Sequence, residues 1–132
     1  MQKVRKKIIW IMGSLLVIFL LGKIIMAYMV QNVNDIPLYP VDFTTMEDQE
    51  KIGEYAIAPV YAKVRVTICD HSITQIILLE HDNGLGSAAE AIVNDVIREQ
   101  SLEVDAISGA TVSSKCILKA IENAVIKGEE EK

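Results

Sequence analysis

The chain has 132 residues, a formal net charge of −5 and only two cysteines and two histidines. Its acidic balance argues against nucleic acid as a partner, because phosphate binding needs patches of Lys and Arg. Two cysteines are too few for a disulfide scaffold, and the Cys and His content offers no convincing zinc, haem or iron–sulfur ligand set. We therefore predict no metal site.

The first predicted element is a membrane-spanning helix over residues 8–30, which are apolar apart from Lys23, a few small residues and Tyr28. A helix of this length spans roughly 35 Å, enough to cross a hydrocarbon core. Four basic residues within residues 1–7 predict, by the positive-inside rule, a cytoplasmic N-terminus and an extracytoplasmic remainder. A cleaved signal peptide is the alternative, less favoured because the apolar stretch is long and no clean cleavage site follows it.

The charged residues are distributed unevenly between residues 1–30, which contain no acidic residue, and the rest of the chain. Residues 31–132 carry eight basic and 18 acidic residues, a net charge of −10. Residues 31–52 contain two prolines and no sustained hydrophobic period, so they predict a linker. Whether Tyr39 and Phe43 pack against the domain is open at this stage. Residues 129–132 predict a solvated acidic tail.

Alternating apolar residues over 55–68 predict β structure, which Pro59 interrupts as a bulge, an edge or a break between two short strands. Residues 70–72 form a turn signal, with His71 suited to the left-handed region. A second β run over 73–80 completes a hairpin.

After a loop over residues 81–86, Ser87 is predicted to cap a helix running to about Gln100. Residues 102–107 predict a short extended piece. The core-facing stripe expected for the helix after Ser87 is Ala88, Ala91/Ile92 and Val96, continued by Leu102 beyond its end.

The last helix is predicted over residues 112–127, with Gly128 ending it. Its apolar face is expected to contain Cys116, Ile117, Ala120, Ile121, Ala124 and Val125. Cys116 is expected to act as a small buried hydrophobe. Whether it pairs with Cys69 is left open.

The predicted fold class is α+β: a small antiparallel hairpin or sheet packed with two helices, preceded by one N-terminal transmembrane helix. The folded domain is placed at residues 53–128. About 80 residues is close to the smallest size that buries a useful core alone.

Residues 105–111, Asp-Ala-Ile-Ser-Gly-Ala-Thr, lead directly into the last helix. The first N–H groups of a helix lack intrahelical partners and carry partial positive charge, so a phosphate can sit there. Gly109 and Ala110 permit close approach of a bulky group, Thr111 supplies a hydroxyl, and Asp105 is a candidate metal or general-base partner. Read locally, the same residues also suit a plain cap and tight turn.

This turn resembles the flavinylation motif D-x-x-[ST]-G-A-[ST] of the FMN-binding domain family, whose members include flavin subunits of the Rnf complex and the sodium-pumping NADH:quinone oxidoreductase. The resemblance extends upstream. Gly53-Glu54-Tyr55 resembles the family's opening G-x-Y, residues 73–76 its second strand, and residues 93–104 its I-x-x-Q-S-x-x-V-D approach. Residues 53–127 are covered in all.

The resemblance implies that a dedicated flavin transferase moves FMN from FAD onto the last hydroxyl of the motif, here Thr111. Asp105, Ser108, Gly109 and Ala110 would be the segment that the transferase reads. It also suggests a ring cleft near residues 81–86, including His81.

The implied function is a membrane-anchored, extracytoplasmic electron carrier with covalent FMN and a membrane redox partner. No acid–base pair or substrate pocket is evident, so no catalytic residue is predicted. Two alternatives remain: a small flavin subunit of a larger ion-pumping complex, and an anchored binding module without redox activity.

Overall fold

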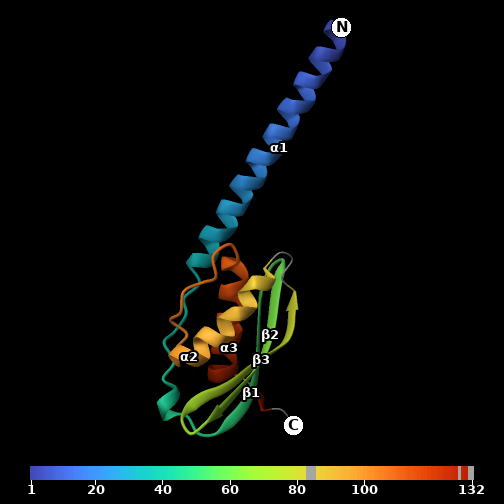
Figure 1. The fold of residues 1–132 in the computed structure, drawn as a ribbon. Helices are drawn as coiled ribbons and strands as arrows, with labels where there is room; N and C mark the ends of the chain where they lie inside the picture. Colours follow the sequence, from blue (N-terminus) through green and yellow to red (C-terminus); the bar gives the residue numbers. More distant parts are fainter. Residues whose placement is uncertain (83–85, 128, 131–132) are drawn as a thin grey trace. The chain divides into compact units, whose positions relative to one another are not determined.

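The computed structural model describes residues 1–82, 86–127 and 129–130. The chain divides into two compact units, Met1–Asn32 and Val33–Lys132. Figure 1 shows the element order along the chain, and each unit is described by itself below.

The first unit is almost entirely one helix, α1 (Gln2–Asn34). Its stretch Gln2–Tyr28 is long and apolar enough to cross a membrane, with a mean hydropathy of 2.5 in its most apolar part. None of that part is buried, whereas the core helix of a soluble protein would be mostly buried. A signal sequence meets the same criteria of length and composition, so these two readings of α1 remain.

The second unit contains an antiparallel sheet with the strand order β3-β2-β1-β4. Its strands are β1 (Gln49–Ile57), β2 (Val60–Cys69), β3 (Ser72–Asp82) and the short β4 (Glu129–Glu130). Pro59 separates β1 from β2, as one reading of the sequence predicted. Asp70 and His71 connect β2 to β3 with φ values of 50° and 59°, which confirms the left-handed conformation of His71. Two consecutive positive φ values are typical of the tight type I′ hairpin turn.

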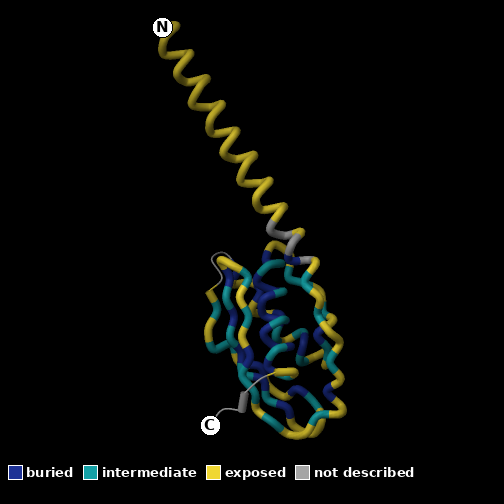
Figure 2. The backbone as a smooth tube through the Cα atoms, turned by 180° about the vertical axis from the view of Figure 1, so that it is seen from behind, coloured by how far each residue is buried: buried dark blue, intermediate teal, exposed yellow. Residues whose placement is uncertain are grey.

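Three helical segments cover one face of this sheet: η2 (Ser87–Ala91), α2 (Ile92–Glu99) and α3 (Thr111–Lys127). α3 packs against β1 and β2, and α2 packs against β3. Along β2, buried side chains alternate with half-buried ones because successive residues point to opposite faces of the sheet. Figure 2 shows the buried residues concentrated between sheet and helices. The predicted α+β class, with an apolar N-terminal helix, is confirmed.

The segment predicted as one helix from Ser87 differs from expectation at its start. Ser87 is not the cap: Gly86 takes that position, without a side-chain hydrogen bond, and a 3₁₀ turn precedes α2. Ala88 and Ala91 are exposed, and Ala89 is buried in their place. A 3₁₀ turn has about 3.0 residues per turn rather than 3.6, so it presents a different set of residues to the core. Ile92, Val96 and Leu102 are buried as predicted.

The last helix matches its predicted face closely. Cys116, Ile117, Ala120, Ile121 and Ala124 are fully buried, and Val125 is partly buried against them. Residues 102–107 connect α2 to the turn without regular secondary structure. α3 ends at Lys127, and Gly128 lies outside the described residues. Glu129–Glu130, expected within a solvated tail, form β4 beside β1.

Residues 35–48, here called the strap, join α1 to β1 and run along the folded unit. β1 begins at Gln49, four residues before the expected domain start. Phe43 is 3% exposed and belongs to the core, whereas Tyr39 is 59% exposed. Phe43 therefore packs into the domain core, whereas most of the Tyr39 side chain is exposed.

Candidate functional site

Residues 107–110 form a tight turn that places Thr111 at the first position of α3. The Ala110 N–H donates to the Ile107 carbonyl oxygen at 2.9 Å, which closes the turn. Gly109 has φ +78°, the conformation that the third residue of a type II turn requires. The Ser114 N–H then donates to the Ala110 carbonyl oxygen at 2.9 Å and starts the helical hydrogen bonding.

Ser114 also ties the turn to the helix through its side chain. Its hydroxyl oxygen accepts a hydrogen bond from the Ile107 N–H at 3.0 Å, and the residue is fully buried. Both ends of the turn are thus bonded to one residue in the first turn of α3. This role of Ser114 did not follow from the sequence. The available signal was a polar side chain on the apolar face of the last helix, where a buried hydroxyl needs a partner.

The motif residues are accessible where a modifying group would need to reach them. Ser108 and Gly109 are exposed, Thr111 is half-buried, and Ala110 is 6% exposed. A Cβ built on Gly109 would meet no atom within 4 Å, so the space beside the turn is open. The N–H groups of α3 that precede Ser114 have no intrahelical acceptors and lie at the positive end of the helix dipole. A hydroxyl, hydrogen-bond donors and free space therefore occur together.

Asp105 is exposed and lines an open, polar pocket of about 530 Å³. The other lining residues are Asp95, Arg98, Glu99, Ser101, Glu103 and Val104. Arg98 bonds to Asp95 at 2.7 Å and to Glu99 at 3.1 Å, and pairing with Glu99 and then Asp95 raises the pKa of Arg98. The pocket was not predicted, because it forms only where the end of α2 meets the chain leading to the motif.

Gln100 fixes the start of the segment that leads to the motif. Its side-chain oxygen accepts from the Ile73 N–H at 2.7 Å, and its amide donates to the Ile73 carbonyl at 2.9 Å and the Ile97 carbonyl at 2.7 Å. Ile73 lies in β3, an edge strand. The side-chain amide therefore pairs with an outward backbone N–H and C=O as a neighbouring strand would. This gives a physical role to the Gln of the approach sequence.

His81 and the loop after it were expected near a ring cleft. The His81 side chain is 3% exposed and its Nδ1 lies 3.1 Å from Glu90 Oε1. Residues 83–85, which form half of that loop, lie outside the described residues. The expected ring cleft remains a prediction.

The two cysteines are separate. The Cys116 thiol lies 3.2 Å from the Tyr55 carbonyl oxygen and 3.9 Å from that of Val60, and both cysteines are free. Cys69 is exposed at the opposite end of β2 from Val60, about 30 Å away at ~3.3 Å per residue. Burial raises the pKa of Cys116 to about 11, so its thiol stays protonated near neutral pH.

Among the residues that the structure describes, no group of three or more His, Cys, Asp or Glu side chains is placed to hold a metal ion.

The family described as the FMN-binding domain matches residues 61–126, half of the chain. Residues 105–111 and α3 lie within that match. A relative named NADH:acrylate oxidoreductase, from Vibrio harveyi, is 38% identical over 65 residues, which are 47% of this chain and 6% of the relative. The chain thus corresponds to a small part of that protein. No solved structure shows a significant match.

Proposed function

This chain belongs to the FMN-binding domain family, and we propose that it is a membrane-anchored, extracytoplasmic electron-transfer flavoprotein carrying FMN as a phosphoester on Thr111. Family membership supports a flavin-binding redox role. The apolar stretch Gln2–Tyr28 is consistent with an anchor. The attachment residue, the covalent bond and the side of the membrane are parts of the proposal.

One observation carries the choice of residue. Thr111 opens a 17-residue helix directly after a turn whose outer side is open space at Gly109. A phosphate esterified to the Thr111 hydroxyl would meet the unpaired N–H groups of the first helical turn, which favour an anion. Ser108 also has a hydroxyl, but it precedes Gly109 within the turn rather than opening the helix.

The proposed maturation step balances with FAD as the donor. The Thr111 Oγ1 attacks the FMN phosphorus of FAD, a P–O bond to Oγ1 forms, and the pyrophosphate P–O bond breaks. AMP leaves, and the hydroxyl proton passes to a base or to solvent. A flavin transferase catalyses this step, and Asp105, Ser108, Gly109 and Ala110 form the segment that it reads.

Bound FMN would supply the redox chemistry, and the protein would hold its phosphate end and position it. The roles assigned to this chain are attachment at Thr111, a fixed turn held by Ser114, and tethering through α1. No residue is proposed to act as an acid or base on a substrate, so the chain acts as a carrier.

The test is to express the full chain with and without a flavin transferase and then to denature it. We expect in-gel flavin fluorescence and a mass gain of one FMN less one water. Thr111→Ala should abolish both, whereas Thr111→Ser should retain them because it keeps the hydroxyl. Fluorescence that survives Thr111→Ala would show that the site is elsewhere. A complete lack of covalent flavin in the unmodified chain would favour the anchored non-redox module.

A second candidate is a small flavin subunit of a larger oxidoreductase complex. It is favoured by the relative of Vibrio harveyi, in which the similar segment is 6% of a long protein whose name describes an oxidoreductase. Blue-native electrophoresis of gently solubilised membranes separates the two candidates. A lone carrier runs as a small species, and a subunit runs with a large complex.

A further inference from the structure

Most of the first ten residues of α3 are buried, so the accessible part of this helix near Thr111 is a narrow stripe. The buried side chains between positions 111 and 120 include Ser113, Ser114, Cys116, Ile117 and Leu118. The half-buried ones are Thr111, Val112, Lys115 and Lys119. Residues four apart share one face of a helix, so Thr111, Lys115 and Lys119 lie in line along the stripe. Lys115 is thus the charged side chain that follows Thr111 on the accessible face of α3.

The Lys115 side chain has the length and the direction to reach a group on the Thr111 hydroxyl. Helical side chains point back toward the N-terminus and cover the preceding turn. Side chains four residues apart have Cβ atoms about 5–6 Å from each other. A flexible four-carbon stem carries the Lys ammonium and its three donors across such a distance. No change in the backbone is needed for the ammonium to lie beside the Thr111 oxygen.

Lys119, one turn further along, has the partners that Lys115 lacks. Lys119 Nζ lies 2.6 Å from Glu122 Oε1 and donates to the Pro37 carbonyl oxygen of the strap at 2.9 Å. The other Glu122 oxygen, Oε2, accepts from the Tyr39 N–H at 3.1 Å. Glu122 is the only acidic residue of α3, and both of its oxygens are therefore engaged. The helix itself offers no carboxylate to Lys115.

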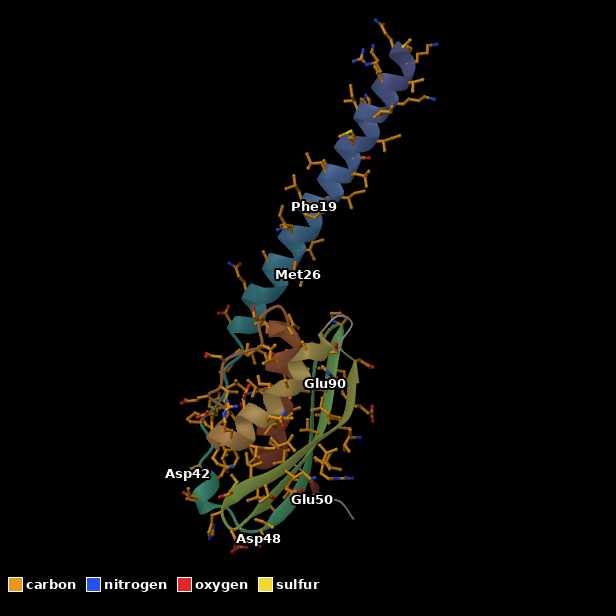
Figure 3. All side chains as sticks on the ribbon, viewed as in Figure 1. Phe19, Met26, Asp42, Asp48, Glu50 and Glu90 are labelled. Carbon is orange, nitrogen blue, oxygen red and sulfur yellow. The ribbon has the colours of Figure 1, made fainter. Side chains whose placement is uncertain are left out.

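This lack of a partner also sets Lys115 apart from most basic residues of the folded unit. Residues 31–132 carry eight basic and 18 acidic residues, and Figure 3 labels four exposed acids, Asp42, Asp48, Glu50 and Glu90. In the part of the unit that the structure describes, the basic residues that interact with neighbours are Lys51, Lys63, Arg65, Arg98 and Lys119. Lys115 and Lys127 have no such partner there, and Lys127 lies at the far end of α3. The ammonium one turn after Thr111 is therefore available to an anion that is not part of the protein.

The electrostatics at the start of α3 favour such an anion. The helix has no acidic residue in its first turn to offset the positive end of its dipole. The N–H groups that precede Ser114 lack intrahelical acceptors. Lys115 adds a full positive charge near them, and this arrangement is unfavourable until an anion lies between the cation and the helix end.

We propose that Lys115 is a positioning residue for the flavin phosphate: its ammonium pairs with the phosphate esterified to Thr111. The phosphate then lies between Lys115 and the free N–H groups at the start of α3, which together offset its charge. The pair limits the freedom of the phosphate end, and it makes attachment of the flavin stabilise the folded unit. This inference rests on the proposed attachment at Thr111.

The test compares the stability of the full chain, in nanodiscs, before and after flavinylation. Urea unfolding followed by circular dichroism gives the two midpoints, and their difference is the gain from the flavin. For the unmodified chain we expect a gain of about 0.5 M or more, because hydrogen bonds to charged groups are among the strongest. Lys115→Met keeps the helix propensity and removes the charge, and it should lose about half of this gain or more.

Two further variants serve as controls. Lys115→Arg should retain the gain, since a guanidinium also binds phosphate. Lys127→Met removes a charge from the other end of α3 and should leave the gain unchanged. A full gain in Lys115→Met would overturn the proposal. If Lys115→Met takes up no flavin while Lys115→Arg does, a cation at position 115 is needed during transfer, which supports the proposal. Failure of both folded variants to take up flavin would overturn it.

The unflavinylated protein gives a result of opposite sign. Without the phosphate, Lys115→Met should leave the midpoint unchanged or raise it by roughly 0.2 M, because it removes a cation from the positive end of the helix. A midpoint that falls below that of unflavinylated Lys127→Met would show that Lys115 stabilises the fold by itself and would overturn the proposal.

Salt provides a second measurement on the flavinylated protein. Raising NaCl from about 0.1 M to about 1 M shortens the Debye length from about 10 Å to about 3 Å. The gain of the unmodified chain should shrink more than the gain of Lys115→Met, since the half-exposed ion pair is screened. Equal shrinkage in both would contradict the pairing. Absence of covalent flavin in the unmodified chain would instead refute the proposed function, so the two failures are distinguishable.

Discussion

Gly53, which lies against α3, and Gly109, in the turn before that helix, are both required, but for different physical reasons. At Gly53, in the contact between β1 and α3, a Cβ would overlap the backbone of Ala120 and Ala124 and lie 2.6 Å from the Ala124 Cα. At Gly109 a Cβ would meet nothing within 4 Å, but φ is +78°. The first glycine permits close packing, and the second permits a backbone conformation beside open space.

The two positions show that the middle and the N-terminus of α3 are under different constraints. The middle of α3 is packed against the sheet so closely that side-chain volume decides whether the unit folds. Its N-terminus follows a turn in which Ser108 and Gly109 are exposed. The buried Ser114 hydroxyl couples the two regions by holding the turn on the packed helix.

The largest effect is expected from Gly53→Ala. The neighbouring atoms are backbone, so β1 or α3 must shift, and we expect a loss of about 3 kcal/mol or more in the free energy of unfolding. Urea unfolding followed by circular dichroism measures it. Ala56→Gly, on the same strand, is a control for the general effect of changing glycine content in β1. A loss below about 1 kcal/mol would show that the contact is less tight than the structure indicates.

A smaller loss of stability is expected from Gly109→Ala, because only the positive φ opposes the new Cβ. We expect about 1 kcal/mol of destabilisation, together with a marked fall in covalent flavin. Gly109→Asn separates the two causes, since Asn tolerates the left-handed region. If Asn regains stability but not flavin, the side chain itself blocks approach to Thr111. Full flavin incorporation in Gly109→Ala would contradict the need for an open turn.

The smallest effect is expected from Cys116→Ala, which tests how the stability of the contact between β1 and α3 depends on pH. Burial raises its pKa from 9.0 to about 11, so the folded state favours the protonated thiol. The resulting stabilisation is fully present below pH 9.0 and is lost as the pH rises through about 11. Cys116→Ala should flatten this alkaline loss in urea unfolding. An unchanged pH slope would assign the loss to other groups.

The same packing predicts that only Cys69 reacts with a thiol reagent in the native protein near neutral pH, while both cysteines react after denaturation. Cys69→Ser provides the control, because the native variant should then show no reaction. Rapid modification of Cys116 in the native state would indicate that the β1–α3 contact opens readily.

Much of the fold was predictable because it depends on local periodicity. The alternation along residues 60–68, the interruption at Pro59 and the apolar face of α3 each follow from a repeat visible in the sequence. The start of the segment at Ser87 was predicted wrongly. Five residues can adopt either 3₁₀ or α-helical geometry, and this segment lies against α3, a contact that the local sequence does not record.

For the candidate site too, local features could be predicted from the sequence and long-range contacts could not. Small residues and a hydroxyl ahead of a helix were readable directly from residues 105–111, and so was the resemblance to a flavin-binding family. The roles of Ser114 and Gln100 were not, because each side chain bonds to backbone brought near it only by folding.

Three features could be read from the amino-acid sequence alone: an apolar helix, an acidic domain, and a Thr hydroxyl at the start of a helix. Composition and spacing specify these because each depends on residues close together in the chain. Other features required the folded structure: the backbone of Pro37 and Tyr39 bonds to Lys119 and Glu122 of α3, and Gly53 brings β1 against Ala120 and Ala124. Those contacts join residues about 70 to 80 positions apart, and no local pattern records which distant surfaces fit together.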